Sequence, residues 1–171
     1  MTVGETDALV ANAGRYHRGL DHSRLAKRPR RRVAVVACMD ARFSVYRLLG
    51  LEEGDAHVIR NAGGAVTDDA IRSLAVSQRL LGTREIILVH HEDCGMRTFT
   101  DTEFARQVEE GTGIRPPWSA EAFTDAGQDV RQCLRRVRSS PFLPHTASVR
   151  GFVYDERTGA MTEVGAVVRP D

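Results

Sequence analysis

Two stretches made almost entirely of apolar residues constrain the fold more than any other feature of the sequence. Within residues 32–38 and 85–90, positions 33–38 and 86–89 are continuous runs of mostly β-branched and small apolar side chains. Such runs are typical of strands that are buried on both faces, as in parallel sheets covered by helices. Helix-like segments separate the runs along the chain, so we predict an α/β fold with a mostly parallel central sheet flanked by helices.

The other elements follow from apolar spacing and from turn residues. Residues 6–26 have helical spacing and form a predicted N-terminal helical arm that stops before Pro29. The remaining predictions are helices at 43–51, 67–82 and 122–137, a strand at 56–60, and a C-terminal antiparallel hairpin of strands at 149–154 and 161–165. A single domain over residues 1–171 accommodates all of them, with the arm at 1–30.

Charge and composition argue against several classes of partner. The chain has 24 Lys and Arg against 23 Asp and Glu, so no overall attraction to nucleic acid is expected. The basic cluster at 27–32 is interpreted as a solvated linker, with an anion-binding arm as the alternative. No apolar run approaches the ~18 residues of a membrane span, and the start does not resemble a secretory signal, so we expect a cytoplasmic protein without membrane contact.

Polar segments follow the ends of three predicted strands. Cys38 ends the first strand, the 60–64 loop follows the second, and His91 and Cys94 follow the third. Parallel strands end at one edge of a sheet and ligands bind there, so we expect these segments to meet in one crevice. Two cysteines and one histidine are ligands that zinc prefers, and they leave a fourth position open.

Three further residues have side chains that could take part in such a site. Asp40 and Arg42 follow Cys38 closely, and a carboxylate and a guanidinium can pair there bidentately. A plain surface ion pair is the alternative, but the position next to a predicted metal ligand favours a catalytic role. The third cysteine, Cys133, is interpreted as an ordinary, partly buried thiol rather than a ligand.

The three motifs together resemble the β-class carbonic anhydrases, in particular their compact bacterial and archaeal branch. Their order, identity and spacing carry the resemblance: Cys38-Met-Asp40-Ala-Arg42, Arg60-Asn61-Ala-Gly63-Gly64 and His91-Glu-Asp-Cys94-Gly95.

The resemblance implies a Zn²⁺ ion on Cys38, His91 and Cys94. It also implies reversible hydration of carbon dioxide to bicarbonate and a proton by zinc-bound hydroxide, with Asp40 orienting the hydroxide and Arg42 holding Asp40. In a closed, inactive state Asp40 would become the fourth zinc ligand.

The residues around these motifs are assigned to the substrate pocket or to its support. Arg60 and Asn61 are expected to brace their loop by hydrogen bonds. Gly63 and Gly64 are expected to leave room for a small linear substrate, with an ordinary turn as the alternative. Gly95 follows the last predicted ligand and belongs to the same group.

The resemblance also implies at least a homodimer, or a dimer of dimers, with the arm laid across a neighbouring subunit. Two other functions stay open. A carbonyl sulfide or carbon disulfide hydrolase would use the same zinc site, and a non-catalytic zinc protein would close the site with Asp40. Glu92 and Arg97 depart from the family pattern, which leaves the substrate preference undecided.

Overall fold

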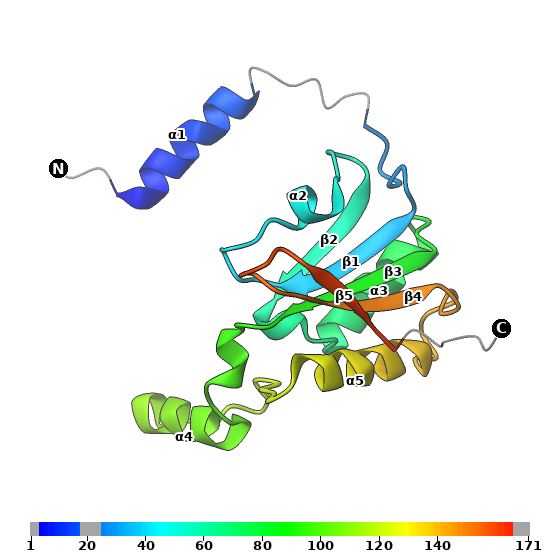
Figure 1. The fold of residues 1–171 in the computed structure, drawn as a ribbon. Helices are drawn as coiled ribbons and strands as arrows, with labels where there is room; N and C mark the ends of the chain where they lie inside the picture. The colour runs from blue at the N-terminus through cyan, green and yellow to red at the C-terminus, as the bar shows by residue number, and fades with distance from the viewer. Residues whose placement is uncertain (1–3, 18–24, 166–171) are drawn as a thin grey trace.

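Five strands form one sheet at the centre of the molecule (Figure 1). A computed structural model describes residues 4–17 and 25–165. The strands, in the spatial order β2-β1-β3-β4-β5, are β1 (Val33–Cys38), β2 (Ala56–Asn61), β3 (Glu85–His91), β4 (Val149–Tyr154) and β5 (Met161–Val164). The pairs β1–β2, β1–β3 and β3–β4 are parallel, and β5 is antiparallel to β4. The predicted mostly parallel sheet with a terminal hairpin is confirmed.

Helices cover both faces of the sheet. Alternate residues of a strand point to opposite faces. Ala34 and Val36 of β1 pack in one apolar cluster with α3 (Asp68–Arg79) and α5 (Ala126–Arg138). Val35 and Ala37 pack in a second cluster, which includes the start of α2 (Val45–Leu49). The apolar runs in the sequence therefore correspond to strands whose side chains are buried on both faces of the sheet, as predicted.

Two predicted helices are shorter than expected because their ends are fixed by capping side chains. The hydroxyl of Ser44 accepts a hydrogen bond from the amide of Arg47 at 3.4 Å, and Gly50 ends α2 in a left-handed conformation. The carboxylate of Asp125 accepts one from the amide of Gln128 at 2.8 Å, so α5 begins at 126 rather than 122.

Helix α4 (Asp101–Thr112) was missed by the sequence analysis. It extends away from the sheet (Figure 1), its side chains are all at least partly exposed, and few of its residues are apolar. A local signal was present. Thr100 and Glu103 form a capping box, in which each side chain bonds the other residue's amide.

The N-terminal helix α1 (Glu5–His17) covers the first half of the predicted 6–26 segment. Residues 18–24 lie outside the described part of the chain. Leu9 and Val10 of α1 are 64% and 71% exposed, so the helix does not bury its apolar residues within one copy of the chain. None of the helices in the described ranges is long and apolar enough to cross a membrane.

The basic segment that precedes β1 is held by acidic residues near the start of β2. Asp55 has a nearly buried carboxylate that accepts hydrogen bonds from the amide of Glu52 at 2.9 Å and from Arg30 Nε at 3.0 Å. Arg31 Nε lies 3.2 Å from Oδ2 of Asp55, the oxygen that also accepts from the Glu52 amide. The hydrogen bond from the Glu52 amide, followed by those from the two arginines, lowers the pKa of Asp55.

We predict that Asp55→Asn destabilises the protein at neutral pH and that this effect disappears in acid. Because the pKa of Asp55 is lower in the folded chain, its ionised form stabilises the fold above the ordinary carboxyl pKa of about 3.9. That contribution is lost as the pH falls through the folded value. Urea midpoints of both proteins should therefore differ most near neutrality and converge below about pH 4.

Glu110→Gln is the control, because Glu110 lies 3.8 Å from Arg106 on the exposed face of α4 and such pairs contribute little. A difference between wild type and Asp55→Asn that stays constant down to pH 3 would show that ionisation is not the cause.

Candidate metal centre

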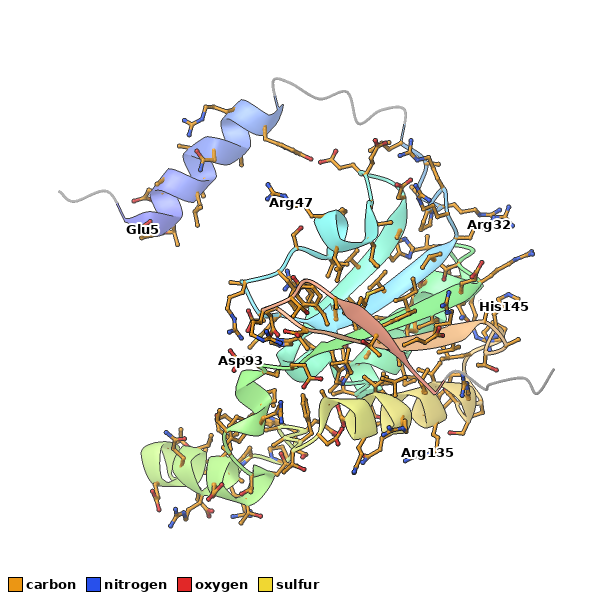
Figure 2. All side chains as sticks on the ribbon, in the orientation of Figure 1. Glu5, Arg32, Arg47, Asp93, Arg135 and His145 are labelled. Atoms are coloured by element: carbon orange, nitrogen blue, oxygen red, sulfur yellow. The ribbon has the colours of Figure 1, made fainter. Side chains whose placement is uncertain are left out.

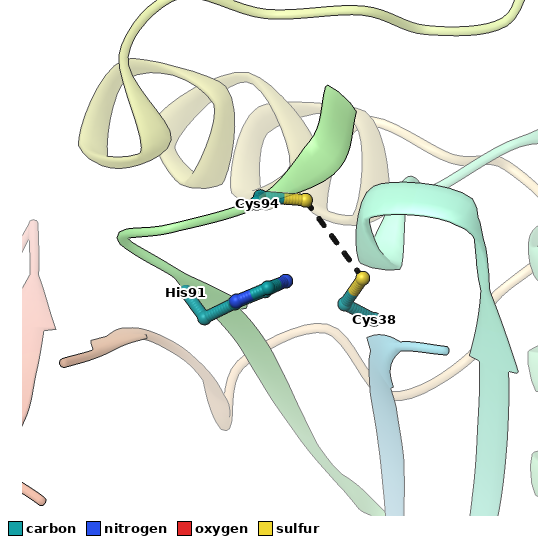
Figure 3. Close-up of side chains that lie close together, drawn as sticks. All are labelled: Cys38, His91 and Cys94. Atoms are coloured by element: carbon teal, nitrogen blue, oxygen red, sulfur yellow. Dashed lines mark hydrogen bonds between the residues drawn. The ribbon is translucent and has the colours of Figure 1, made fainter. Parts of the chain in front are cut away.

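Two cysteines and a histidine meet at the carboxyl ends of the central strands. Cys38 ends β1, His91 ends β3, and Cys94 precedes a short 3-10 turn at Gly95–Arg97. All three are buried, and their ligand atoms lie within 4.8 Å of one another. The two sulfurs are 3.8 Å apart, and the imidazole points toward them (Figure 3). The convergence predicted from strand ends is therefore present.

The chemistry of this cluster fits a bound divalent cation. Nε2 of His91 is buried and has no hydrogen-bond partner within the described residues, which is costly for a polar atom. Hydrogen bonding with Cys94 lowers the pKa of Cys38, and the same contact raises the pKa of Cys94. Only one of the two thiols can therefore ionise readily on its own. A zinc ion would stabilise both thiolates and use the free Nε2.

Asp40 and Arg42 form a bidentate pair beside the cluster. Arg42 Nε and Nη2 donate to the two carboxylate oxygens of Asp40 at 3.0 and 2.8 Å. The hydrogen bond from the Arg42 side chain lowers the pKa of Asp40 to about 2. Oδ2 of Asp40 is 3.9 Å from the free Nε2 of His91, so the ionised carboxylate faces the position that a metal would occupy.

Asp93, which the sequence analysis missed, holds Arg42 from the other side. It lies at the exit of β3 (Figure 2). Its carboxylate and its backbone carbonyl each accept a hydrogen bond from Arg42. The guanidinium thus spans from the Cys38 loop to the His91 loop. A signal was available, because Asp93 stands between two predicted ligands in the third motif.

Glu156 is the second residue that the sequence analysis missed. Its Oε1 contacts Nδ1 of His91, and its Oε2 accepts a hydrogen bond from the amide of Asp93 at 3.3 Å. Burial opposes ionisation of Glu156, but the hydrogen bonds with His91 and Asp93 outweigh it and lower its pKa. Glu156 belongs to the turn between β4 and β5, so no motif in the sequence connected it with the ligands.

Arg60 and Asn61 support the loops around the cluster. Arg60 Nε donates to the carbonyl of Cys38 at 2.9 Å, and its Nη2 donates to the carbonyl of Asp40. Its guanidinium also lies 5.3 Å from the centre of the Phe43 ring. Asn61 Nδ2 donates to the carbonyl of Ala65 at 2.8 Å. Both side chains therefore bond backbone atoms of loops that flank the ligands.

A mostly apolar pocket lies beside the 60–64 loop. Its volume is about 570 Å³, and its wall includes Met39, Ala62, Met96 and Trp118. Met39 follows the ligand Cys38 and Met96 lies two residues after Cys94, so the pocket is bounded by segments that also carry the ligands. Its lining suits a small uncharged molecule better than an ion.

The two residues that depart from the family pattern contact each other. Arg97 donates to the backbone carbonyl of Glu92 and lies 3.5 Å from its carboxylate. Arg97 Nε also donates to the carbonyl of Thr124 at 3.1 Å. Arg97 is therefore held against backbone, and this ties the ligand loop to the segment that precedes α5.

A second group of metal-ligating residue types lies behind the sheet. His90, Asp129 and Cys133 also have ligand atoms within 4.8 Å of one another. His90 precedes His91 in β3 and therefore points to the opposite face. Its Nε2 is 2.6 Å from Asp129 Oδ2, so this ring nitrogen already has a carboxylate partner.

Comparisons with known proteins identify the family. A carbonic anhydrase family model matches residues 33–140. Beta-carbonic anhydrase 1 of Mycobacterium tuberculosis H37Rv is 58% identical over 164 residues, which cover 96% of this chain and 99% of that protein. The chain belongs to the β-carbonic anhydrase family. Enzymes of this family use zinc, and the Cys38, His91 and Cys94 cluster is positioned to bind it.

Two further relatives are a carbonic anhydrase of known structure and an enzyme with a different named activity. The crystal structure of carbonic anhydrase from Streptococcus mutans has a TM-score of 0.87 and 40% identity, and the match covers 96% of this chain and 100% of that one. A carbon disulfide hydrolase of Saccharolobus solfataricus is 51% identical over 152 residues, which cover 75% of this chain and 74% of that protein. The β-carbonic anhydrase fold therefore accompanies more than one named activity.

Two glycines of the 60–64 loop in this β-carbonic anhydrase site lie very close to other parts of the structure. A Cβ on Gly64 would lie 2.9 Å from the amide nitrogen of Cys38 and 3.1 Å from the carbonyl oxygen of Val89. A Cβ on Gly63 would meet Met96 and Phe123 at 3.2 Å. Gly64 in particular lets its loop pack against the backbone of β1 and β3.

Gly95 has open space where a Cβ would stand. Its carbonyl accepts hydrogen bonds from the amide and the hydroxyl of Thr98, at 3.2 and 2.8 Å. It therefore takes part in the turn that follows Cys94.

We predict that Gly64→Ala destabilises the fold far more than Gly159→Ala. Both glycines have nearly the same φ, +75° and +74°, but nothing lies within 4 Å of a Cβ on Gly159. Gly159→Ala should cost about 1–2 kcal/mol from left-handed strain alone. Gly64→Ala should cost about 2 kcal/mol more, because its methyl group overlaps strand backbone. Urea unfolding measures both losses, and equal losses would refute the packing argument.

Proposed function

We propose that this protein is a zinc enzyme that hydrates carbon dioxide reversibly to bicarbonate and a proton. The observation that carries the proposal is the buried triangle of Cys38, His91 and Cys94 with the Asp40–Arg42 pair on its open side. The high identity to a β-carbonic anhydrase over nearly the whole chain supports the same conclusion.

Cys38, His91 and Cys94 would hold the ion through two sulfurs and Nε2. When bound, zinc supplies a Lewis acid that makes a water molecule at its fourth position more acidic. Two thiolates reduce the net charge of such a centre, so neighbouring residues have to contribute to activating and aiming the nucleophile.

Asp40 is the residue best placed to orient the nucleophile. Its carboxylate stays ionised over the physiological pH range because Arg42 binds it bidentately. An ionised carboxylate only accepts hydrogen bonds. It would therefore fix the direction of an O–H donor at the fourth metal position, and a lone pair of that donor oxygen would then point toward carbon dioxide. Arg42 is itself fixed by Asp93, which limits the movement of the pair.

The pairing of Asp40 with Arg42 also bears on the non-catalytic alternative. A closed site requires the Asp40 carboxylate to leave Arg42 and complete the metal shell. Three hydrogen bonds between the Arg42 side chain and Asp40 oppose that movement. The open arrangement supports catalysis rather than a purely structural zinc site.

Carbon disulfide is the second candidate substrate. Carbon disulfide hydrolases are 34–51% identical to this chain, and the apolar cavity of about 570 Å³ has room for a molecule larger than carbon dioxide. Carbonyl sulfide is intermediate in size. The chain matches β-carbonic anhydrase 1 over more of its length and at higher identity, which favours carbon dioxide.

The exposed apolar residues of α1 support an assembly of at least two copies. Leu9 and Val10 are mostly exposed in one copy, and a second subunit is the partner that would bury them. A homodimer, or a dimer of dimers, with α1 as the contacting arm is therefore part of the proposal. All three cysteines are free, which agrees with a reducing, cytoplasmic location.

We predict that Asp40→Ala retains zinc but lowers turnover of carbon dioxide about 100-fold, because orientation of the nucleophile is lost. Stopped-flow hydration and metal analysis measure the two properties on one sample. Glu163→Ala is the matched control, because Glu163 forms a similar bidentate pair with Arg150 away from the metal centre. The control should leave both properties unchanged.

Each contrary outcome has a distinct meaning. Full turnover in Asp40→Ala would remove Asp40 from the mechanism. Release of sulfide from carbon disulfide without hydration of carbon dioxide would favour the hydrolase. A zinc-loaded protein inactive toward both substrates at every pH would favour a non-catalytic site.

We predict that the double substitution Leu9→Asp and Val10→Asp converts the assembly to monomers, because charged side chains would have to be buried in the contact. Sedimentation velocity gives the oligomeric state. Leu80→Asp is the control, because Leu80 is 75% exposed at the C-terminal end of α3 and not on α1. A wild-type protein that is monomeric and active would refute the role of the arm.

A further inference from the structure

Glu156 is the carboxylate nearest to the ring of the candidate ligand His91. It comes from the turn between β4 and β5, far from the three motifs in the sequence. Its side chain is only 15% exposed, and its Oε1 contacts Nδ1 of His91. Nδ1 is thus the ring nitrogen that contacts Glu156, and the other ring nitrogen, Nε2, is buried without a hydrogen-bond partner among the described residues.

The turn that carries Glu156 is held in place by Asp155. The carboxylate of Asp155 accepts hydrogen bonds from the amides of Arg157 and Thr158 and from the Thr158 hydroxyl, at 2.9, 3.3 and 2.8 Å. Backbone bonds from Asp155 to Ala160 close the same turn. Glu156 therefore belongs to a turn whose backbone is held by several internal hydrogen bonds.

The contact decides which ring nitrogen carries the proton. A neutral imidazole has one N–H donor and one lone pair, and an ionised carboxylate can only accept. Glu156 therefore selects the form of His91 with the proton on Nδ1. This leaves the lone pair on Nε2, the atom that lies 3.9 Å from Asp40 and faces the sulfurs.

Glu156 also fixes the direction in which the ring points. Its second oxygen accepts a hydrogen bond from the amide of Asp93, which lies between the ligands His91 and Cys94. Arg42 Nη2 lies 3.7 Å from Oε1. One carboxylate thus connects a ligand ring, the backbone of the ligand loop and the guanidinium that holds Asp40.

We propose that Glu156 is a positioning residue that sets the tautomer and orientation of His91 and so determines how tightly the protein binds zinc. The inference rests on the ligand set of the proposed function. Carboxylates that accept from a metal-bound histidine have this effect in general, and their removal typically weakens metal binding about 10–100-fold.

His90 offers an internal comparison. It neighbours His91 in β3 and pairs with the carboxylate of Asp129 at 2.6 Å, but on the opposite face of the sheet. Asp129→Ala therefore removes the same type of histidine–carboxylate contact from the same strand without touching the ligand cluster. It is the matched control for an effect of lost packing.

The test compares zinc dissociation constants, from competition with a chromophoric chelator, in wild type, Glu156→Ala, Glu156→Gln and Asp129→Ala. We expect Glu156→Ala to weaken zinc binding about 10–100-fold. Glu156→Gln should lose less, because its amide oxygen still accepts from Nδ1–H. Asp129→Ala should bind zinc as wild type does, and circular dichroism verifies that each variant is folded.

A spectroscopic measurement separates positioning from general stability. In the zinc-loaded wild type, nitrogen-edited NMR should detect a slowly exchanging Nδ1–H proton on His91. This signal should shift but persist in Glu156→Gln and be lost to exchange in Glu156→Ala.

Unchanged zinc affinity in a folded Glu156→Ala, or an equal loss in Asp129→Ala, would overturn the inference. Neither readout depends on turnover. An inactive protein with the expected order of zinc affinities would count against the proposed function alone, whereas an active protein without that order would count against Glu156 alone.

Discussion

The parallel pairing of β1 with β3 is the constraint on which the rest of the structure depends. Val33 pairs with Glu85 and Ala37 with Val89, so both strands end at the same edge of the sheet. That register brings Cys38 and His91 together although they are far apart in the sequence. It also creates the narrow space between strand backbones that only a glycine at 64 can enter. A slip of one residue would turn the alternating side chains to the wrong faces.

Around the ligands, the structure places carboxylates in excess of cations. Arg42 lies among Asp40, Asp93 and Glu156, and it bonds the first two while remaining close to the third. Two thiols, one of which ionises readily, add to the negative charge. Such an arrangement in a partly buried site favours occupation by a divalent cation.

Much of the fold and of the ligand set could be predicted from the sequence, and particular residues show where the prediction stopped. Uniformly apolar strands predicted the parallel sheet, and strand ends predicted that Cys38, His91 and Cys94 would meet. Helix α4 was missed because it contains few apolar residues and buries none of them. Glu156 was missed because a contact between a turn and a distant strand leaves no periodic or motif signal. Whether the 1–171 chain behaves as one domain stays a prediction.

Cys38 and His91 come from the carboxyl ends of two strands that are distant in the sequence, and Glu156 joins them from the terminal hairpin. No short peptide of this chain contains the complete centre, so it cannot exist before the sheet has closed around β3. The complete set of zinc ligands therefore forms only together with the native sheet. Full occupation of this centre by zinc requires the native topology, whereas the native topology does not require zinc.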